Sequence, residues 1–566
     1  MFKKPVLLIA CLGFTVLIFC CLRLVPKADR IYIHARIWTG DPQNPWAEAL
    51  AIKGTTIVFV GKDYRSYQSP RTVVVDLHGS FMVPGFIDSH THFLAGGYSL
   101  ANLNLHDVSA IPDFIRQFGA FAKGQSGTEW IENGNWDNER WGGELPHKEW
   151  IDSLSGLHPV FIKRYDIHMG LANSLALKLA KIGSKTPDPA GGQIVRDPKT
   201  GEPTGILKDN AMDLMIRAIP EPSHKQLDRY LSMAQHEAFS HGLTQVHDMS
   251  SYGGWTDLGT YQRAHQNGTL KLRVYAFVPI FTWARLAAYV RIHGRGDMQL
   301  RWGGLKAFVD GSLGSTTAWL NSPYKDAPTK TGLQITDTVV LQRLIISADS
   351  AGLQVASHAI GDHANDFILN AYQQADRHNG VRDRRFRVEH AQHLTAAAIP
   401  RFGLLGVIPS MQPYHLIDDG KWAAKRLDSN RLKNAYAFKS LLATGATVTF
   451  GSDWTVAPLE PLKGIYAAVT RRTLDDKNPD GWYPAQKIKV DQALRCYTRN
   501  AAFAGFQENV LGRLKAGMLA DMVVLSADLF EIRPEEIWNV EVLRTIVGGE
   551  EVFQMPKPGT DYKVSK

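Results

Sequence analysis

The feature that most constrains this chain is a series of apolar, strand-like runs that each end in a side chain able to bind a metal. The first, VPGFIDSHTHF, is mostly apolar from Val83 to Ile87 and turns polar at Asp88, just before His90 and His92. Residues i and i+2 of a strand point to the same side, so the two histidines can converge on one ion. Histidine is the commonest neutral nitrogen ligand of zinc and related metals. Because a single H-x-H pair also occurs by chance, its weight depends on the rest of the chain.

Later runs end in the same way. GGLKAFVDGSLG places Lys306 among apolar residues, LQVASHAIGDH ends its run at His358, RFRVEHAQH at His390 and ATVTFGSDW at Asp453. Strands that alternate with helix-length stretches predict a parallel sheet of βα units, and barrel enzymes carry their chemistry at the carboxyl ends of such strands. Each residue alone has an ordinary structural interpretation, such as a helix N-cap or a lysine with an exposed amine. As an ordered set, they favour a metal site.

The set resembles the amidohydrolase superfamily, and most of all its subgroup of YtcJ-like metal-dependent hydrolases (amidohydrolase family 3). The resemblance covers nearly all of residues 30–556. It is carried by the segments PGFIDSHTHF, GGLKAFVDGSLGSTTAWL, SHAIGDHANDFIL, RVEHAQHL, SMQPYH, FGSDWTVAPLEP and LGRLKAGMLADMVVL. These motifs are specific for the family and do not identify a substrate.

The fold that the resemblance implies is α/β: a distorted (β/α)8 TIM barrel over residues 83–504. Eight strand-like runs fit this barrel, the first at 83–88 and the others near residues 243, 273, 305, 354, 386, 406 and 448. Short alternating runs punctuated by glycines predict β structure in residues 30–82 and again in 505–566. By resemblance, these two ends pair into one small composite β-sandwich.

The gap between the first two barrel strands, about residues 95–240, is too long for a structureless loop and predicts an inserted subdomain. Similar insertions in the subgroup contribute to the substrate pocket. We therefore predict substrate-binding residues there, with one more at the end of the seventh strand: Trp136, Asp137, Trp141, His168 and Gln412. The alternative, that the tryptophans hold together the insertion's own core, is equally open.

The first 29 residues form a separate segment. Lys3 and Lys4 precede an uncharged apolar stretch from Pro5 to Leu22, and a membrane-spanning helix needs roughly 20 such residues. The stretch lacks a good small-residue cleavage site at its end. We therefore expect an uncleaved transmembrane anchor with the catalytic domain outside the cytoplasm, on the periplasmic or extracellular side. Secretion after signal cleavage is the alternative.

Composition limits the partners. The chain has 566 residues, 44% of them hydrophobic and 21% charged, which suits a large globular barrel with a smaller domain. Its net charge is +8, but lysine and arginine are scattered, so no nucleic-acid partner is expected. Outside the apolar N-terminal segment Cys496 is alone, so the fold needs no intrachain disulfide. We expect a small-molecule substrate and a membrane as partners, and a homodimer stays open.

The resemblance also implies two divalent ions, zinc first, with iron, manganese or cobalt as alternatives. The histidine and aspartate ligands divide into two sets: His90, His92 and Asp453 for the more buried ion, and His358 and His390 for the outer one. Since an ammonium group has no lone pair for a cation, Lys306 is expected to be carboxylated by carbon dioxide and to bridge the two ions. If Lys306 stays an amine, one ion is expected.

The implied reaction is hydrolysis of a carbon–nitrogen bond, preferably in a linear N-acyl or N-formyl amide, by a metal-activated hydroxide. Asp453 would act as general base and then as general acid. A cyclic amidine deaminase and a lactone or ester hydrolase are alternatives on the same scaffold; the deaminase ranks lower because HAIGDH lacks the H-A-E pattern of that group. An alternative of another class is a membrane-anchored regulatory protein on a retired hydrolase fold, ranked low because the ligand set is complete.

Overall fold

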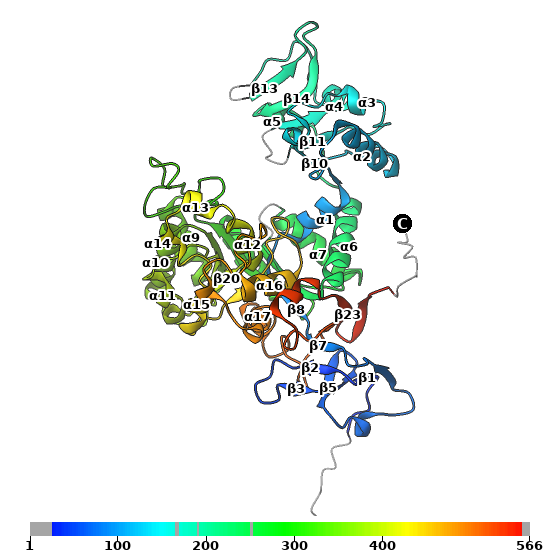
Figure 1. Cartoon of the computed structure of the whole chain (residues 1–566), viewed down its shortest axis with the longest axis vertical. Helices are drawn as coiled ribbons and strands as arrows, with labels where there is room; N and C mark the ends of the chain where they lie inside the picture. The colour runs from blue at the N-terminus through cyan, green and yellow to red at the C-terminus, as the bar shows by residue number, and fades with distance from the viewer. Residues whose placement is uncertain (1–24, 165–168, 190–191, 250–252, 557–566) are drawn as a thin grey trace, which may run out of the picture.

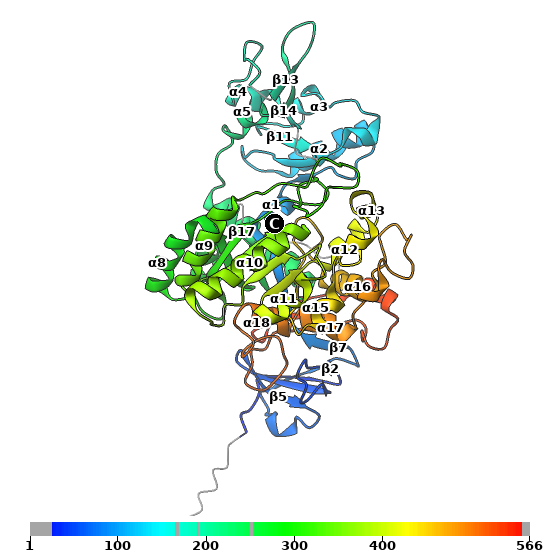
Figure 2. The same ribbon diagram turned by 90° about the vertical axis from the view of Figure 1, so that its left-hand side faces the viewer.

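The structure is a computed structural model that describes residues 25–556 except 165–168, 190–191 and 250–252. The apolar stretch of the predicted membrane anchor lies in residues 1–24, outside the described residues. Within the described part of the chain, no helix combines the length and the apolar character needed to cross a bilayer. Three bodies follow one another along the long axis: a β-sandwich, a barrel and an inserted subdomain (Figures 1 and 2).

The central body is the predicted barrel. Its eight parallel strands neighbour one another in chain order: β8 (Phe86–Thr91), β15 (Leu243–Asp248), β16 (Arg273–Pro279), β17 (Leu300–Phe308), β18 (Gln354–Ala359), β19 (Arg387–His390), β20 (Ile408–Met411) and β21 (Thr449–Phe450). The last strand closes on the first where the backbone N–H of His92 donates to the carbonyl oxygen of Trp454 at 2.7 Å. The prediction of an eight-stranded α/β barrel is confirmed in this almost closed sheet.

Helices cover the outside of the barrel. They are α1 (Phe93–Ala101), α6 (His224–Ser240), α7 (Trp255–Gln266), α8 (Trp283–His293), α9 (Thr338–Ser350), α10 (Asp362–Asn379), α11 (Ala398–Leu405), α12 (Pro413–Asp419), α13 (Ala423–Arg426), α14 (Ser429–Leu432), α15 (Phe438–Ala443), α16 (Pro461–Thr470), α17 (Val490–Cys496) and α18 (Arg499–Ala504). Short 3-10 turns lie at η3 (Ile280–Thr282) and η4 (Pro484–Gln486). Because these helices cover the sheet, strands such as β8 are buried at every position.

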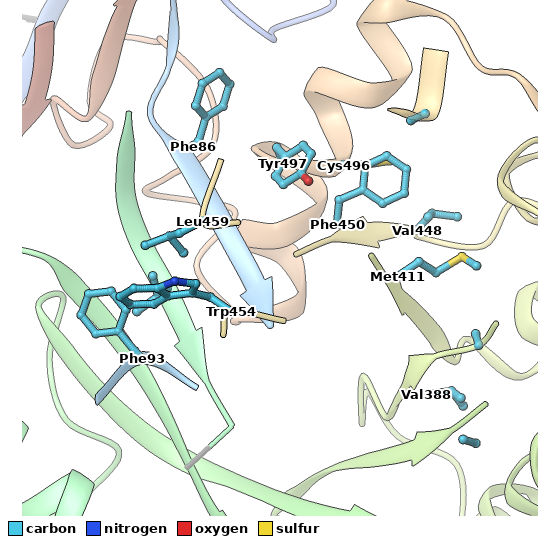
Figure 3. Packing of buried hydrophobic residues seen from close by; sticks show 14 of the residues in the cluster. Phe86, Phe93, Val388, Met411, Val448, Phe450, Trp454, Leu459, Cys496 and Tyr497 are labelled. Carbon is cyan, nitrogen blue, oxygen red and sulfur yellow. The ribbon is translucent and has the colours of Figure 1, made fainter. Parts of the chain in front are cut away.

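Aromatic side chains pack between the ends of the barrel sheet and the surrounding helices (Figure 3). The ring of Trp454, directly after Asp453, lies against Phe93 of α1, with ring centroids 5.9 Å apart. Tyr497 packs on Phe450, with centroids 5.5 Å apart. This packing fixes the segment that carries Asp453 next to the strand that carries the H-x-H pair.

Both ends of the chain build the sandwich. One sheet has the order β5-β4-β1-β6 and the other β24-β23-β22-β7-β2-β3. The strands are β1 (Arg30–Ile33), β2 (Arg36–Trp38), β3 (Trp46–Ala47), β4 (Ala49–Lys53), β5 (Thr56–Gly61), β6 (Val73–Asp76), β7 (Phe81–Pro84), β22 (Met522–Leu525), β23 (Val542–Val547) and β24 (Glu550–Gln554), with 3-10 turns η1 (Arg65–Tyr67) and η5 (Pro534–Asn539). Strand β22 pairs antiparallel with β7, which joins the two ends.

The first barrel strand begins later than predicted. The sequence favoured one run from residue 83, but residues 81–84 belong to the sandwich and the barrel strand starts at Phe86. Gly85 separates the two, and a Cβ on it would lie 2.3 Å from the side chain of Thr244 on β15. Because the run is apolar throughout, its sequence does not show where the sandwich strand ends and the barrel strand begins.

The insertion is also smaller than the predicted 95–240. Its sheet has the order β13-β14-β12-β11-β10-β9. Its elements are β9 (Leu103–Asn104), α2 (Ile111–Gly124), β10 (Asn133–Trp136), η2 (Asn138–Trp141), α3 (Glu149–Asp152), β11 (Phe161–Arg164), β12 (Met169–Ala172), α4 (Ser174–Leu179), β13 (Gly192–Arg196), β14 (Pro203–Asp209) and α5 (Met212–Ile216). Helices α1 and α6 pack on each other beside the barrel instead, so closely that a Cβ on Gly97 would lie 2.0 Å from the carbonyl oxygen of Tyr230.

Candidate metal centre

Three predicted ligands meet at the carboxyl ends of the barrel strands. The Nε2 atoms of His90 and His92 lie 3.3 and 3.2 Å from Oδ1 of Asp453. Ligand atoms of His90, His390 and Asp453 all lie within 4.8 Å of one another, and all three residues are buried. The backbone bond from the N–H of Asp453 to the carbonyl oxygen of His90, at 2.7 Å, holds strand one and the end of strand eight in register.

The other predicted ligands surround this group. Nζ of Lys306 lies 3.4 Å from Nε2 of His90, and the rings of His358 and His390 have centroids 4.4 Å apart. Nε2 of His358 also lies 3.1 Å from the carbonyl oxygen of Gly311. The structure therefore brings all six predicted ligands together: five of them line a cavity of about 530 Å³, and His90 is fully buried.

Two acceptors behind the histidines make this group suitable for a divalent ion. Nδ1 of His90 lies 2.6 Å from Oε2 of Glu389, and Nδ1 of His390 lies 2.8 Å from Oε1 of Gln412. When Nδ1 carries the proton that such a bond requires, the lone pair of Nε2 faces the centre, as in metal-bound histidines. Imidazole nitrogens and a carboxylate are the ligands that zinc and its neighbours prefer, so these residues fit a divalent metal. Gln412, predicted to bind substrate, supports His390 instead.

Glu389 is a functional residue that the sequence prediction missed. It is fully buried, and its Oε1 lies 2.8 Å from Nε of Arg387, which is also fully buried. The other two guanidinium nitrogens of Arg387 contact two further side chains: Nη2 lies 2.9 Å from Oγ of Ser410, and Nη1 lies 3.0 Å from Nδ1 of His247. The signal was present in the sequence, because RVEH places two opposite charges two residues apart in an apolar strand run.

Burial and neighbouring charges set the ionisation of the site. Burial alone would raise the pKa of Asp453, but the charge of His90 and hydrogen bonds from His90 and His92 hold that pKa well below its ordinary value. Burial, with the charge of Lys306, lowers the pKa of His358 to about 3, and burial lowers the pKa of His390 well below its usual value. Neutral imidazoles and an ionised carboxylate are the protonation states that metal binding requires.

Lys306 is almost fully buried, and burial lowers its pKa to about 8 against the opposing charges of Glu389 and Asp453. An amine with that pKa is partly neutral near pH 8. Burial therefore favours the neutral form of this amine, which is the form that has a lone pair on nitrogen.

The insertion residues predicted to bind substrate are placed elsewhere. Trp136 is fully buried in the insertion's own core, where its Nε1–H donates to the carbonyl oxygen of Ile162 at 2.9 Å. Trp141 packs on it, with ring centroids 6.4 Å apart, and Oδ1 of Asp137 lies 2.7 Å from Nη2 of Arg164. The alternative interpretation of these tryptophans therefore holds, because both pack against helix α2 within the core of the insertion. His168 lies outside the described residues.

The walls of the cavity come mainly from the segments that follow β17, β18, β20 and β21, including helix α12. Its apolar lining residues are Phe308, Leu313, Ile335, Ile360, Tyr414, Trp422, Val456 and Ala457. His415, at the start of α12, has Nε2 3.8 Å from Oδ2 of Asp453 and no hydrogen-bond partner for that atom among the described residues. Lys306 is the one lysine or arginine among the described residues that line the cavity.

A parallel (β/α)8 barrel with an H-x-H pair, a lysine, two histidines and an aspartate at its strand ends defines a metal-dependent hydrolase. Comparison with known proteins agrees with this class. The amidohydrolase family profile matches residues 73–553. The chain therefore belongs to the amidohydrolase family, whose members hydrolyse carbon–nitrogen bonds with the help of a metal.

The most similar relatives extend along almost the whole chain. The chain is 40% identical to Protein LONG AFTER FAR-RED 3 of Arabidopsis thaliana over 93% of its own length and 92% of the relative's. It is 33% identical to the putative amidohydrolase YtcJ of Bacillus subtilis (92% and 98%) and 26% identical to the N-substituted formamide deformylase of Arthrobacter pascens (92% and 97%). An uncharacterized metal-dependent hydrolase of Pyrococcus horikoshii has the same fold, with a TM-score of 0.75, 27% identity and coverage of 89% and 99%.

Proposed function

We propose that this chain hydrolyses a linear amide of the N-acyl or N-formyl type. The observation that carries the proposal is the position of Asp453, an ionised carboxylate in contact with His90 and His92 beneath an open cavity. The relative named N-substituted formamide deformylase, similar over nearly the full length, supports a formamide-like substrate.

Asp453 performs the proton transfers in this proposal. A divalent ion bound by the histidines and Asp453 would supply Lewis acidity for the substrate carbonyl and for the attacking water. Asp453 accepts a proton from the water while the water oxygen forms a bond to the carbonyl carbon of the substrate. It then donates that proton to the nitrogen as the carbon–nitrogen bond breaks, which releases a carboxylic acid and an amine. His415, 3.8 Å from Asp453, is within reach of a substrate polar group at the same point.

The finer metal chemistry also belongs to the proposal. We infer that the site would hold two ions, zinc by preference, and that Lys306 would contribute to both as a carbamate, formed from the neutral amine and carbon dioxide with loss of a proton. The distance of 3.4 Å between Lys306 and His90 and the nearby pair of His358 and His390 support this arrangement. Glu389 and Gln412 would keep the histidines in the ligating tautomer.

The cavity favours a substrate without negative charge. Its walls combine apolar and aromatic side chains with the carboxyl groups of Asp418 and Asp419. An anionic substituent would lie near these carboxyl groups with no free lysine or arginine to pair with it, because Lys306, the one such residue in the described lining, is engaged at the metal centre. An apolar acyl or aryl amide fits best.

An activity panel tests the reaction class. N-formyl and N-acyl amides with benzyl or alkyl groups should be hydrolysed, and matched amides with a carboxylate substituent should react more slowly. Turnover of cyclic amidines or lactones in place of amides would replace the proposal with the corresponding alternative. A metal-loaded protein that hydrolyses none of these compounds would favour the regulatory alternative.

We also propose that the first 29 residues anchor the chain in a membrane with the catalytic body outside the cytoplasm. The uncharged apolar stretch behind Lys3 and Lys4 supports this. Membrane fractionation with protease added from outside tests it: the anchored chain should sediment with membranes and be digested. Recovery in the soluble fraction would contradict the anchor.

A further inference from the structure

The amino ends of strands β17, β18 and β19 enclose a second cavity of about 270 Å³. The walls come from the segments at these amino ends: Arg295 in the loop before β17 and Arg301 within β17, then Gly352 to Gln354 where β18 begins, then Arg382 to Arg384 before β19. The metal ligands Lys306, His358 and His390 lie at the opposite ends of the same three strands. The cavity is therefore separate from the catalytic mouth.

Two arginines of this cavity lack a counter-charge. Arg382 and Arg384 both pair with Asp349, at 2.5 and 2.7 Å. In contrast, neither Arg295 nor Arg301 forms an ion pair with a carboxylate among the described residues. Nε of Arg301 is buried without a hydrogen-bond partner there. Burial lowers the pKa of Arg301 and the nearby charge of Arg295 lowers it further, while Tyr275 and Glu508 oppose these effects.

The loop between α8 and β17 is built to hold the two guanidinium groups in this position. Gly294 and Gly296 take positive φ angles of 66° and 81°, and Gly296 pairs with Arg301 in an antiparallel bridge. Nη2 of Arg295 donates to the carbonyl oxygen of Gly352 at 2.6 Å. At Gly303, also with a positive φ, a Cβ would lie 2.2 Å from Nη1 of Arg295, so a larger residue here would displace the guanidinium from this position.

We propose that this cavity is a binding site for a phosphate dianion, either free or as a small phosphate monoester. The lining carboxylates Asp349 and Asp383 are held by Arg382, Arg384 and Arg385. The two guanidinium groups without an ion pair among the described residues therefore match a doubly charged tetrahedral anion in charge and in hydrogen-bond geometry. Tyr275, Leu353 and Phe506 supply an apolar wall, and the volume leaves space beside a phosphate for a small organic group. The site lies apart from the reaction and does not rest on the proposed activity.

Calorimetric titration of the full-length protein with inorganic phosphate and with phenyl phosphate tests this site, with sodium chloride at matched ionic strength as reference. Wild type should bind phosphate saturably. Arg301→Gln and Arg295→Gln should each raise the Kd by about tenfold or more, as expected for loss of a charge-assisted contact. Arg71→Gln, an exposed arginine on the sandwich, should bind like wild type. The pair of cavity variants keeps the test valid if one of them fails to fold.

The two ligands distinguish the source of the anion. Tighter binding of phenyl phosphate identifies a monoester site, and equal or weaker binding identifies a site for free phosphate. Binding that is unchanged in both cavity variants, or that chloride reproduces, would overturn the proposal. Binding lost in Lys306→Ala but kept in Arg301→Gln would assign the anion to the metal centre and would overturn it as well.

Discussion

Asp453 touches both histidines of the first strand, and its hydrogen bonds keep it ionised. Asn at this position keeps the shape and one oxygen but cannot accept and return a proton. We expect Asp453→Asn to lower kcat by about 10²- to 10⁴-fold while thermal stability stays close to wild type. Steady-state kinetics and thermal unfolding check this, and a variant with wild-type kcat would remove Asp453 from the mechanism.

Glu389 and Arg387 form a buried ion pair beneath the metal centre. Removing the carboxylate charge leaves Arg387 buried without compensation, so we expect Glu389→Gln to reduce the free energy of unfolding at pH 7 by about 3–5 kcal/mol. Glu508→Gln, which affects a partly exposed pair with Arg385 at 2.8 Å, should cost about 1 kcal/mol or less. Urea unfolding of metal-free protein measures both.

The loss of unfolding free energy in Glu389→Gln should depend on pH in one direction. Burial raises the pKa of Glu389, but Arg387 and His90 outweigh it and hold that pKa far below the ordinary value. A depressed folded-state pKa adds stability above the unfolded value of about 4.3, and that stability is lost as the pH falls through the folded-state pKa. The difference in the free energy of unfolding between wild type and Glu389→Gln should therefore become smaller only below about pH 4. A gap that narrows between pH 6 and 8 would contradict the assignment.

At the scale of elements, glycine allows helices α1 and α6 to approach closely. A Cβ on Gly97 would lie 2.0 Å from a backbone oxygen of α6, which cannot move without the helix. Gly97→Ala should destabilise the protein by about 1–3 kcal/mol. Gly259→Ala, in α7 with nothing within 4 Å of its Cβ, should stabilise it by about 0.4–1 kcal/mol. Equal effects of the two variants in thermal unfolding would show that the close approach does not matter.

The strand ends were predictable because a buried parallel strand reads as an apolar run, and the residue type at its end is visible. That reasoning located the eight strands and the residues His90, His92 and Asp453 that the structure brings together. It could not separate the sandwich strand that ends at Pro84 from the barrel strand that starts at Phe86, because both are apolar. The role of Gln412 as a hydrogen-bond partner of His390 was also not predictable, because the direction in which a side chain points depends on tertiary contacts.

At the scale of the molecule, the insertion has a core of its own. Trp136 is fully buried in it and lies outside the lining of the catalytic cavity. We expect Trp136→Ala to destabilise the insertion by about 3–5 kcal/mol, seen as an earlier unfolding step in calorimetry, while KM stays within about twofold of wild type at temperatures below that step. A large rise in KM in the folded variant would restore the substrate-binding role that the sequence left open beside the core role.

The sequence could not decide between the two roles of these tryptophans. Aromatic residues in an insertion near a barrel mouth suit either a pocket or a core, and only their packing against helix α2 distinguishes the two. The short alternating runs predicted β structure at both chain ends, and the family resemblance implied that the two ends pair into one sandwich.

Metal content per chain tests the central claim most directly. The full-length protein, prepared with zinc and bicarbonate at pH 8, is analysed for bound metal beside Lys306→Ala and Arg71→Gln. The account predicts close to two ions in wild type and in Arg71→Gln, and one or fewer in Lys306→Ala. Wild-type protein that binds no metal under these conditions would contradict the assignment of a metal centre to the barrel mouth.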